Sequence, residues 1–250
     1  MEPSGFQTFG VPHLAAIALT AALAAFLPRY TARRQPKVAT RIAIVIAAIL
    51  LANDLVYWTY RIHTAGVDAW LQQYLPLHVC GAAVQLTAFT LIFRNRWTYD
   101  IAWFWGITGA LNAVLTPGGM DQGFPAYRFF QYFIAHSGIV IGVIFATFGL
   151  GMRPRLRGLV RAFVTINLFA AAVAVANWLL DANYMYLRAP PPGTVSPFFF
   201  APWPWYLLVL EVVAMTMFLV VLAPFAWKRL SSRSRDPRAP GSSAGGVGSS

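Results

Sequence analysis

Seven long apolar runs divide the chain, and short polar segments separate them. Most runs reach the roughly 20 residues that a helix needs to cross a bilayer, and the first is the shortest. The pattern predicts an all-α fold, a polytopic membrane bundle of seven transmembrane helices. The expected helices cover approximately residues 11–27, 42–60, 71–93, 97–115, 129–152, 159–180 and 203–227.

The composition agrees with this pattern. Hydrophobic residues make up 58% of the chain and charged residues only 11%, which is too little charge to cover the surface of a soluble domain. The net charge of +11 does not indicate a nucleic-acid partner, because the basic residues lie in short segments between apolar runs. A single cysteine excludes a disulfide or cysteine-rich metal framework, and we expect no metal or cofactor.

The basic residues also predict the orientation in the membrane. The segments that follow the first, third, fifth and seventh runs carry sixteen lysines and arginines, whereas the opposite side has only Arg61, Arg128 and Arg188. By the positive-inside rule, the N-terminus is outside and the C-terminus is cytoplasmic. Because basic residues follow the first run and none precedes it, we interpret this run as a retained helix and not as a signal peptide.

The domain organisation follows from the same runs. Residues 1–230 form one transmembrane domain, and residues 231–250, which are rich in Ser, Gly, Arg and Pro, form a disordered cytoplasmic tail. Two longer outer segments, 116–128 and 187–202, contain several glycines and prolines and are expected to fold over the outer end of the bundle.

Ionisable side chains from four predicted helices share one depth. Counted from the outer helix ends at 1.5 Å per residue, all of them lie roughly 10–14 Å deep. Groups of this kind are costly at membrane depth, so a shared layer favours a polar site that opens outward. The layer contains His78 and Cys80, His136, Asn53 with Asp54, and Glu211.

The third predicted helix carries Cys80, the single cysteine, two residues after His78. On a regular helix these two side chains point to nearly opposite faces, so His136 is the better base for Cys80, unless Pro76 distorts the helix. Polar positions on both sides of this helix predict that it is central in the bundle. A structural pair between Asp54 and Arg61 is also expected.

Several motifs resemble those of a known family. The run Leu75-Pro76-Leu77-His78-Val79-Cys80 is similar to a signature of the YwaF-type bacterial integral membrane proteins. Phe130–Gly138, which contains His136, resembles their second histidine motif, and Asn177-Trp178 and Pro202–Tyr206 resemble later ones. This resemblance implies a multi-pass protein of the bacterial plasma (inner) membrane.

The same family is similar to eukaryotic TMEM-type cysteine acyltransferases, which move acyl chains between phospholipids. The resemblance implies that Cys80 is the nucleophile, that His136 is the second-motif histidine, and that membrane phospholipids are the partners. Acyl transfer through a thioester also needs donors for an oxyanion and a group that orients the base. The polar layer offers Asn53, Tyr57 or Asn177 as donors and Asp54 or Glu211 as the orienting group.

Two other functions fit the same residues. His78 and His136 are able to act as the axial ligands of a haem in an electron carrier, for which Cys80 is not needed. Alternatively, Asp54 or Glu211 binds a solute or ion in a transporter or receptor-like bundle. Without the resemblance, this second alternative and the acyltransferase are nearly equal. The sequence indicates no protein partner.

Overall fold

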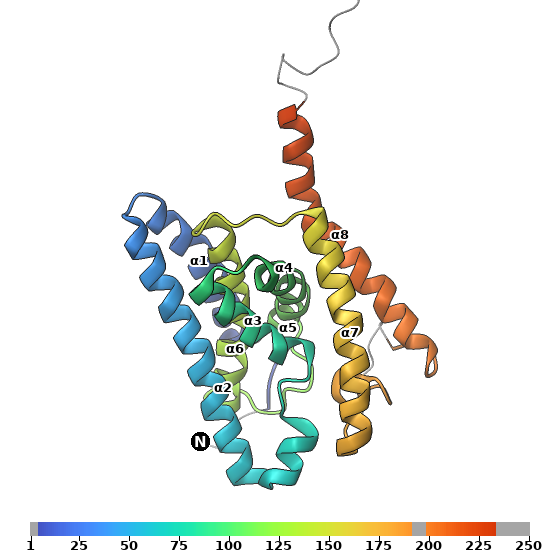
Figure 1. The fold of residues 1–250 in the computed structure, drawn as a ribbon. Helices are drawn as coiled ribbons and strands as arrows, with labels where there is room; N and C mark the ends of the chain where they lie inside the picture. The colour runs from blue at the N-terminus through green and yellow to red at the C-terminus, as the bar shows by residue number, and fades with distance from the viewer. Residues whose placement is uncertain (1–4, 192–198, 234–250) are drawn as a thin grey trace, which may run out of the picture.

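A computed structural model describes residues 5–191 and 199–233, and these are all-helical apart from one isolated β-bridge between Gly5 and Gln122 (Figure 1). The all-α class is therefore confirmed. The elements are α1 (Val11–Ala32), α2 (Pro36–Gln73), α3 (Val79–Phe93), α4 (Arg96–Trp105), the π-helix η1 (Gly106–Ala110), α5 (Leu111–Leu115), α6 (Tyr127–Phe148), α7 (Leu156–Leu180), the 3-10 turn η2 (Tyr184–Tyr186) and α8 (Trp205–Arg233).

Five of these helices are long and apolar enough to cross a membrane: α1, α2, α6, α7 and α8. Two predicted spans correspond to shorter pieces. Helix α3 has 15 residues, and the segment from Arg96 to Leu115 is divided by the π-helix η1 into α4 and α5. The chain is thus an integral membrane protein by length and composition, and the count of seven crossings stays a prediction.

The third predicted helix, 71–93, is divided in the structure. Helix α2 continues to Gln73, bends at Gly66, where φ is +84°, and α3 begins only at Val79. Pro76 lies between them, has no N–H to donate to a helix and disfavours helical backbone at the residue before it. His78 therefore precedes α3 with extended backbone angles, so the predicted helix 71–93 is interrupted, and the distortion near Pro76 that the sequence left open is observed.

Helix α6 is the centre of the bundle. In its span 67% of the residues are buried, against 17–28% in the other four candidate spans. Two glycines allow this packing, because a Cβ at Gly138 would lie 2.7 Å from a Leu50 methyl of α2, and one at Gly142 would lie 2.6 Å from a Thr87 methyl of α3. The helix expected to be central, α3, packs against α2, α4 and α6.

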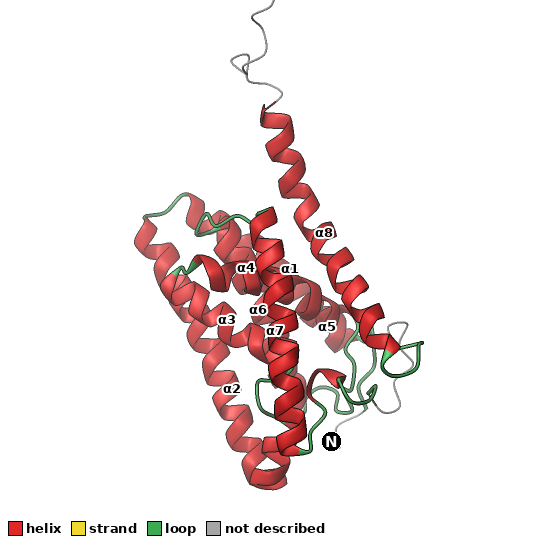
Figure 2. Cartoon of the chain, turned by 45° about the vertical axis from the view of Figure 1, so that its right-hand side comes forward, coloured by secondary structure: helices red, strands yellow, loops and turns green. Residues whose placement is uncertain are grey.

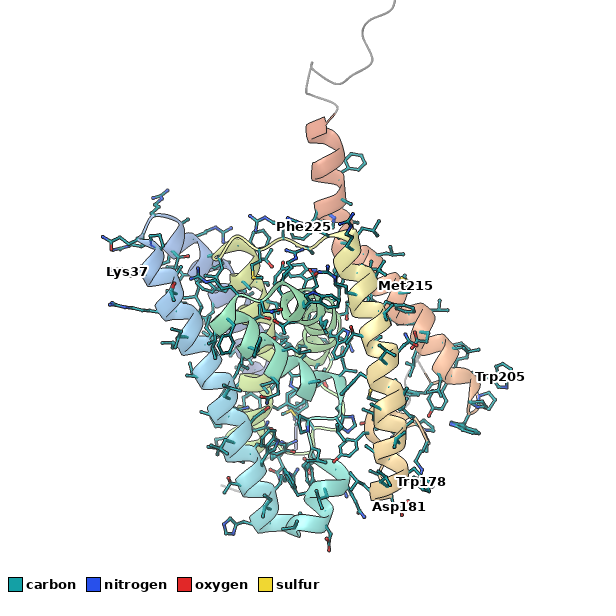
Figure 3. The ribbon with its side chains drawn as sticks, viewed as in Figure 1. Lys37, Trp178, Asp181, Trp205, Met215 and Phe225 are labelled. Atoms are coloured by element: carbon teal, nitrogen blue, oxygen red, sulfur yellow. The ribbon has the colours of Figure 1, made fainter. Side chains whose placement is uncertain are left out.

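The basic segments gather at one end of the bundle. The turn between α1 and α2, the connection from α6 to α7 and the C-terminal end of α8 lie together there (Figures 1 and 2). Arg94 donates to Thr40, and Arg96 donates to the carbonyl of Arg153, so contacts join three of these segments. Figure 3 shows Lys37 at this end and Asp181 at the opposite end. The predicted grouping of basic segments is consistent with the fold.

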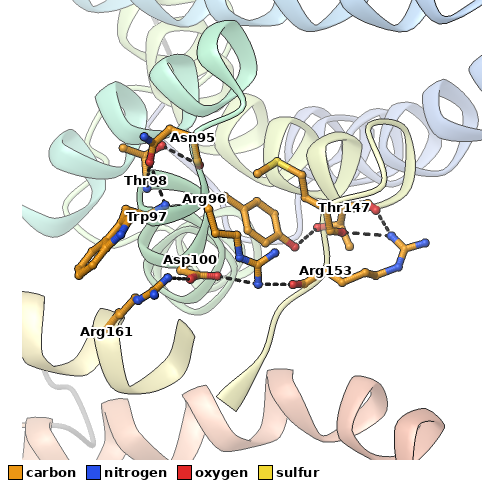
Figure 4. A network of polar contacts seen from close by, with 10 residues as sticks. Asn95, Arg96, Trp97, Thr98, Asp100, Thr147, Arg153 and Arg161 are labelled. Carbon is orange, nitrogen blue, oxygen red and sulfur yellow. Dashed lines mark hydrogen bonds and ion pairs between the residues drawn. The ribbon is translucent and has the colours of Figure 1, made fainter. Parts of the chain in front are cut away.

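A buried carboxylate holds this basic end together (Figure 4). Asp100 of α4 is 1% exposed and pairs with Arg96 at 3.0 Å and with Arg161 of α7 at 3.1 Å. Beside it, the Tyr99 hydroxyl lies 2.8 Å from the Thr147 hydroxyl of α6. One cluster of polar contacts thus ties α4 to both α6 and α7.

The segment predicted to be a disordered tail, 231–250, lies mostly outside the described residues. Residues 234–250 lie outside the described residues, and α8 continues to Arg233, three residues past the predicted domain boundary at 230. The second outer segment, 187–202, is described except for residues 192–198.

Candidate functional site

Cys80 is the second residue of α3 and is half-buried. Its thiol faces the π-helix η1, because a Cβ at Gly109 would lie 3.5 Å from the Cys80 sulfur. A π-helix inside an α-helix frequently marks a functional position. A thiolate at Cys80 would also lie at the positive end of the α3 dipole, next to N–H groups of the first helical turn.

His136 of α6 has one defined tautomer. Its Nδ1 lies 2.9 Å from the carbonyl oxygen of Tyr132, one turn earlier in the helix. A carbonyl oxygen accepts hydrogen bonds and donates none, so Nδ1 carries the proton and Nε2 keeps its lone pair. Within the described residues Nε2 has no hydrogen-bond partner. His136 is therefore in the form that accepts a proton at Nε2.

His78 has the opposite tautomer. Its Nδ1 accepts a hydrogen bond of 3.3 Å from the backbone N–H of Met185, so the proton of the neutral ring is on Nε2. The ring packs against Tyr184 and Tyr186, with centroids 5.2 and 5.4 Å away. In this state His78 is a hydrogen-bond donor and a structural contact of the outer turn, not a base.

Two tyrosines that the sequence analysis did not select lie around Cys80. The phenols of Tyr132 and Tyr186 both lie near the Cys80 thiol. The Tyr132 ring also packs against His136 in a tilted arrangement, with centroids 4.1 Å apart, and its hydroxyl donates to the carbonyl of Ala113 at 3.2 Å. Tyr132 is thus a neighbour of both predicted catalytic residues.

Cys80 and His136 are brought to the same part of the bundle, but no hydrogen bond joins them in the described chain. The Tyr132 ring and the η1 segment lie next to them. Hydrogen bonds between catalytic groups are often long or unformed before substrate binds. A signal for Tyr132 was present in the sequence, because it precedes His136 by four residues and shares its helix face.

The turn η2 packs against His78 near the end of the bundle that lies opposite the basic segments (Figure 3). Met185 and Tyr186 both have left-handed backbone angles, with φ of 56° and 55°, which is costly for residues with side chains. Asn177 of α7 holds the turn by accepting from the Tyr184 N–H at 2.7 Å and donating to its carbonyl at 3.0 Å. The hydroxyl of Tyr206 donates to the Tyr186 carbonyl. The Asn177 side chain therefore holds the backbone of this turn at both polar atoms.

Replacing Asn177 with alanine should lower the free energy of unfolding by about 2–3 kcal/mol, because two buried backbone groups of Tyr184 lose their partners. The matched control is Asn167→Ala on the same helix. Its side chain also loses two hydrogen bonds, to Glu211 and to the Phe163 carbonyl, but it is exposed and water replaces them, so we expect less than about 1 kcal/mol there. Thermal unfolding of both variants in one detergent measures the difference. Equal losses would contradict the clamping role of Asn177.

The rest of the predicted polar layer divides into separate contacts. Asp54, which is 7% exposed, accepts from Gln85 of α3 at 2.8 Å. Arg61 instead donates to the Tyr57 hydroxyl at 3.2 Å, so the expected pair between Asp54 and Arg61 is wrong. Asp54 is buried between α2 and α3, and a neutral amide reaches it there, whereas the aromatic rings of the outer end surround the arginine.

Asn53, Tyr57 and Glu211 also lie in structural contacts. Asn53 donates to the carbonyl of Gln131 on α6 at 3.3 Å, and the Tyr57 ring lies under the guanidinium of Arg128. Glu211 of α8 accepts from Asn167 of α7 at 3.1 Å, at one side of the bundle. Neither Asp54 nor Glu211 bonds to a histidine in the described residues, and no group of three metal-ligating side chains is found among them.

These observations define an all-helical integral membrane protein in which Tyr132 packs against His136 and Cys80 faces a π-helix. The chain belongs to the TMEM164 family, whose model matches residues 8–222. It is also 25% identical to an uncharacterised protein of Treponema pallidum (strain Nichols) over 231 residues, which is 88% of this chain and 90% of that protein. No solved structure matches the chain. The resemblance to TMEM-type proteins is confirmed at the level of the family.

Proposed function

We propose that this protein is a membrane acyltransferase that takes an acyl chain from a phospholipid onto Cys80 and passes it to a second acceptor. The observation that carries the proposal is the tautomer of His136, whose Nδ1–H is held by the Tyr132 carbonyl while Nε2 keeps a free lone pair. A histidine held in this way, in the same region as a lone cysteine, has the arrangement that nucleophilic catalysis requires. We also propose that the protein is related to the YwaF-type bacterial membrane proteins, whose motifs it resembles.

The first half of the reaction acylates the cysteine. His136 Nε2 takes the thiol proton of Cys80, and the thiolate attacks the ester carbonyl of the phospholipid. The ester C–O bond breaks, the lysophospholipid alkoxide leaves with the proton from the imidazolium, and a thioester remains on Cys80. The Nε2–H of His78 is available as a donor to the oxyanion, because its Nδ1 is already occupied by Met185.

The second half reverses these roles. The hydroxyl of the acceptor gives its proton to His136 Nε2, and its oxygen attacks the thioester carbonyl. The C–S bond breaks, and the thiolate recovers the proton from the imidazolium. The acceptor is a second lipid or water, and in either case the acyl group ends as an ester or a free acid and the enzyme is restored.

The proposed setting is a bacterial inner membrane with seven crossings, an outer N-terminus and a cytoplasmic C-terminus. The five candidate spans are joined in this proposal by α3 and by the α4–η1–α5 segment, each of which packs against α6. The gathering of the basic segments at one end supports that orientation, because the positive-inside rule places such segments in the cytoplasm. Cys80 then lies nearer the outer end.

The two alternatives have weaker support from the contacts. A haem-ligating histidine binds iron through an unprotonated nitrogen, whereas the Met185 N–H on Nδ1 leaves His78 protonated at Nε2. In a solute carrier, Asp54 or Glu211 would have to face the solute, and each is bonded to a neighbouring amide side chain.

Acylation of the purified protein tests the proposal. We expect p-nitrophenyl palmitate to transfer one palmitoyl group to the wild type, with release of p-nitrophenol, and intact mass to show one adduct. Hydroxylamine, which cleaves thioesters, should remove it. The Cys80→Ser variant should acquire no hydroxylamine-labile adduct. A folded wild type that stays unmodified, or an adduct that persists without Cys80, would contradict the role of this thiol.

A further inference from the structure

A long apolar groove lies between α1 and α2 and has α6 as its floor. Its volume of about 840 Å³ is within the range of small-molecule sites in proteins, about 300–1,000 Å³. Almost the whole lining is apolar. The lining includes Leu19 and Leu23 of α1, Ile42 and Ile49 of α2, and Phe133 and Ile141 of α6.

The few hydroxyl groups in the groove are already engaged. The hydroxyls of Thr20 and Ser137 lie 2.6 Å apart and bond to each other across α1 and α6. The Thr20 hydroxyl also lies 2.7 Å from the carbonyl of Ala16. Because these groups satisfy one another, the middle of the groove offers nothing to a polar solute, and it suits a hydrocarbon occupant.

The groove is long enough to hold the acyl chain of a lipid. Its lining on α1 runs from Val11 to Leu27, which is about 24 Å of helix at 1.5 Å per residue. The hydrocarbon core of a bilayer is about 30 Å thick. An acyl chain of one leaflet covers about half of that thickness, so the groove is long enough to hold one along its whole length.

One end of the groove carries a free positive charge. Arg41 lines this end, is exposed, and pairs with no acidic group in the described residues. A second groove of about 650 Å³ on the other face of α1 ends in the same way, at Arg29. Both arginines lie at the basic end of the bundle, where the phosphates of one leaflet would be found.

This groove is separate from the candidate catalytic site. Tyr132 reaches toward Ala113 of α5, and neither Tyr132 nor His136 lines the groove. The α6 residues that do line it, such as Phe133, Ser137 and Ile141, recur at the spacing of a different helix face. An occupant of the groove therefore does not need to be a substrate.

We propose that the groove binds the acyl chain of an anionic phospholipid whose phosphate pairs with Arg41. The lipid fills the space that α1 and α2 leave between them and joins both helices to α6. It belongs to the leaflet at the basic end, whereas Cys80 lies nearer the opposite end. The proposal does not depend on acyl transfer.

Native mass spectrometry with titrated palmitoyl-oleoyl phosphatidylglycerol tests the charge contact, and phosphatidylcholine with the same chains is the neutral comparison. We expect Arg41→Gln to lower the affinity for one bound phosphatidylglycerol by about five-fold and to leave the affinity for phosphatidylcholine unchanged. The matched control is Lys37→Gln, which removes the same charge at the start of α2 without touching the groove. Equal losses in both variants would indicate diffuse attraction and overturn the site.

A second pair of variants tests the groove itself. Ala15 lines the groove and Ala18 lines neither groove, although both are exposed on α1. Ala15→Trp should fill the groove and remove one bound lipid of either headgroup, whereas Ala18→Trp should retain it. An unchanged count in Ala15→Trp would overturn the proposal. Cys80→Ser should bind the same number of lipids as the wild type. The lipid-binding result can therefore be interpreted even if the proposed acyl transfer fails.

Discussion

Replacing His136 with alanine should slow the acylation of Cys80 by about 10²–10⁴-fold, the usual contribution of a positioned general base. The physical reason is the hydrogen bond from Nδ1–H to the Tyr132 carbonyl, which leaves Nε2 as the nitrogen that accepts the thiol proton. Time courses of the palmitoyl adduct by intact mass give the rate. Without His136, the rate should rise nearly tenfold per pH unit, because hydroxide then has to generate the thiolate.

The matched control for this experiment is His63→Ala. His63 is exposed on α2 and has no contact with the candidate site, so its removal should leave the acylation rate unchanged. His78→Ala should produce an intermediate loss, because it removes a contact of the η2 turn and a proposed oxyanion donor. If His136→Ala acylates as fast as His63→Ala, His136 is a packing residue and the proposed mechanism fails.

The sequence located most of the helices, but it did not predict their contacts or the breaks within the segments 71–93 and 97–115. Hydropathy reports which segments prefer an apolar environment, so the apolar runs near residues 11–32, 127–148 and 156–180 were found within a few residues of their observed ends. It does not report which helix lies at the centre. That position depends on small residues such as Gly138 and Gly142, which let α2 and α3 approach α6 closely.

In the candidate site, too, the sequence predicts which residues matter but not the hydrogen bonds of their individual atoms. The sequence directs attention to Cys80 and His136, because ionisable groups at membrane depth are rare. The tautomers of the histidines depend on partners that no spacing rule predicts, since the donor to His78 is the backbone of Met185, 107 residues later. The π-helix beside Cys80 also interrupts the regular period of 3.6 residues from which faces are predicted.

Asp100 has a signal in the sequence that points to its role. It lies in the predicted helix 97–115, where a charged residue is costly and therefore informative. Arg96 precedes it by four residues, which is the spacing of a helical ion pair. The second partner, Arg161, lies 61 residues later on α7, and only the fold brings it there.

Replacing Asp100 with alanine should lower the free energy of unfolding by about 3 kcal/mol. Removal of one member of a buried ion pair costs about 3–5 kcal/mol, because the remaining charge is left without compensation. We expect the lower end of that range, since the side chains of Arg96 and Arg161 are each 32% exposed and water reaches them. Denaturation of the purified variants in one detergent gives the value.

The chain offers a matched control in Asp181→Ala. Asp181 forms an ion pair of 2.7 Å with Arg188, but the two side chains are 85% and 53% exposed, so its loss should cost less than about 1 kcal/mol. Gly158→Ala should resemble Asp100→Ala, because the new Cβ would lie 2.6 Å from an Asp100 carboxylate oxygen. If Asp100→Ala and Asp181→Ala lower the free energy of unfolding equally, the Asp100 cluster does not join α4 to α7. The close packing of Gly158 against Asp100 would then have another cause.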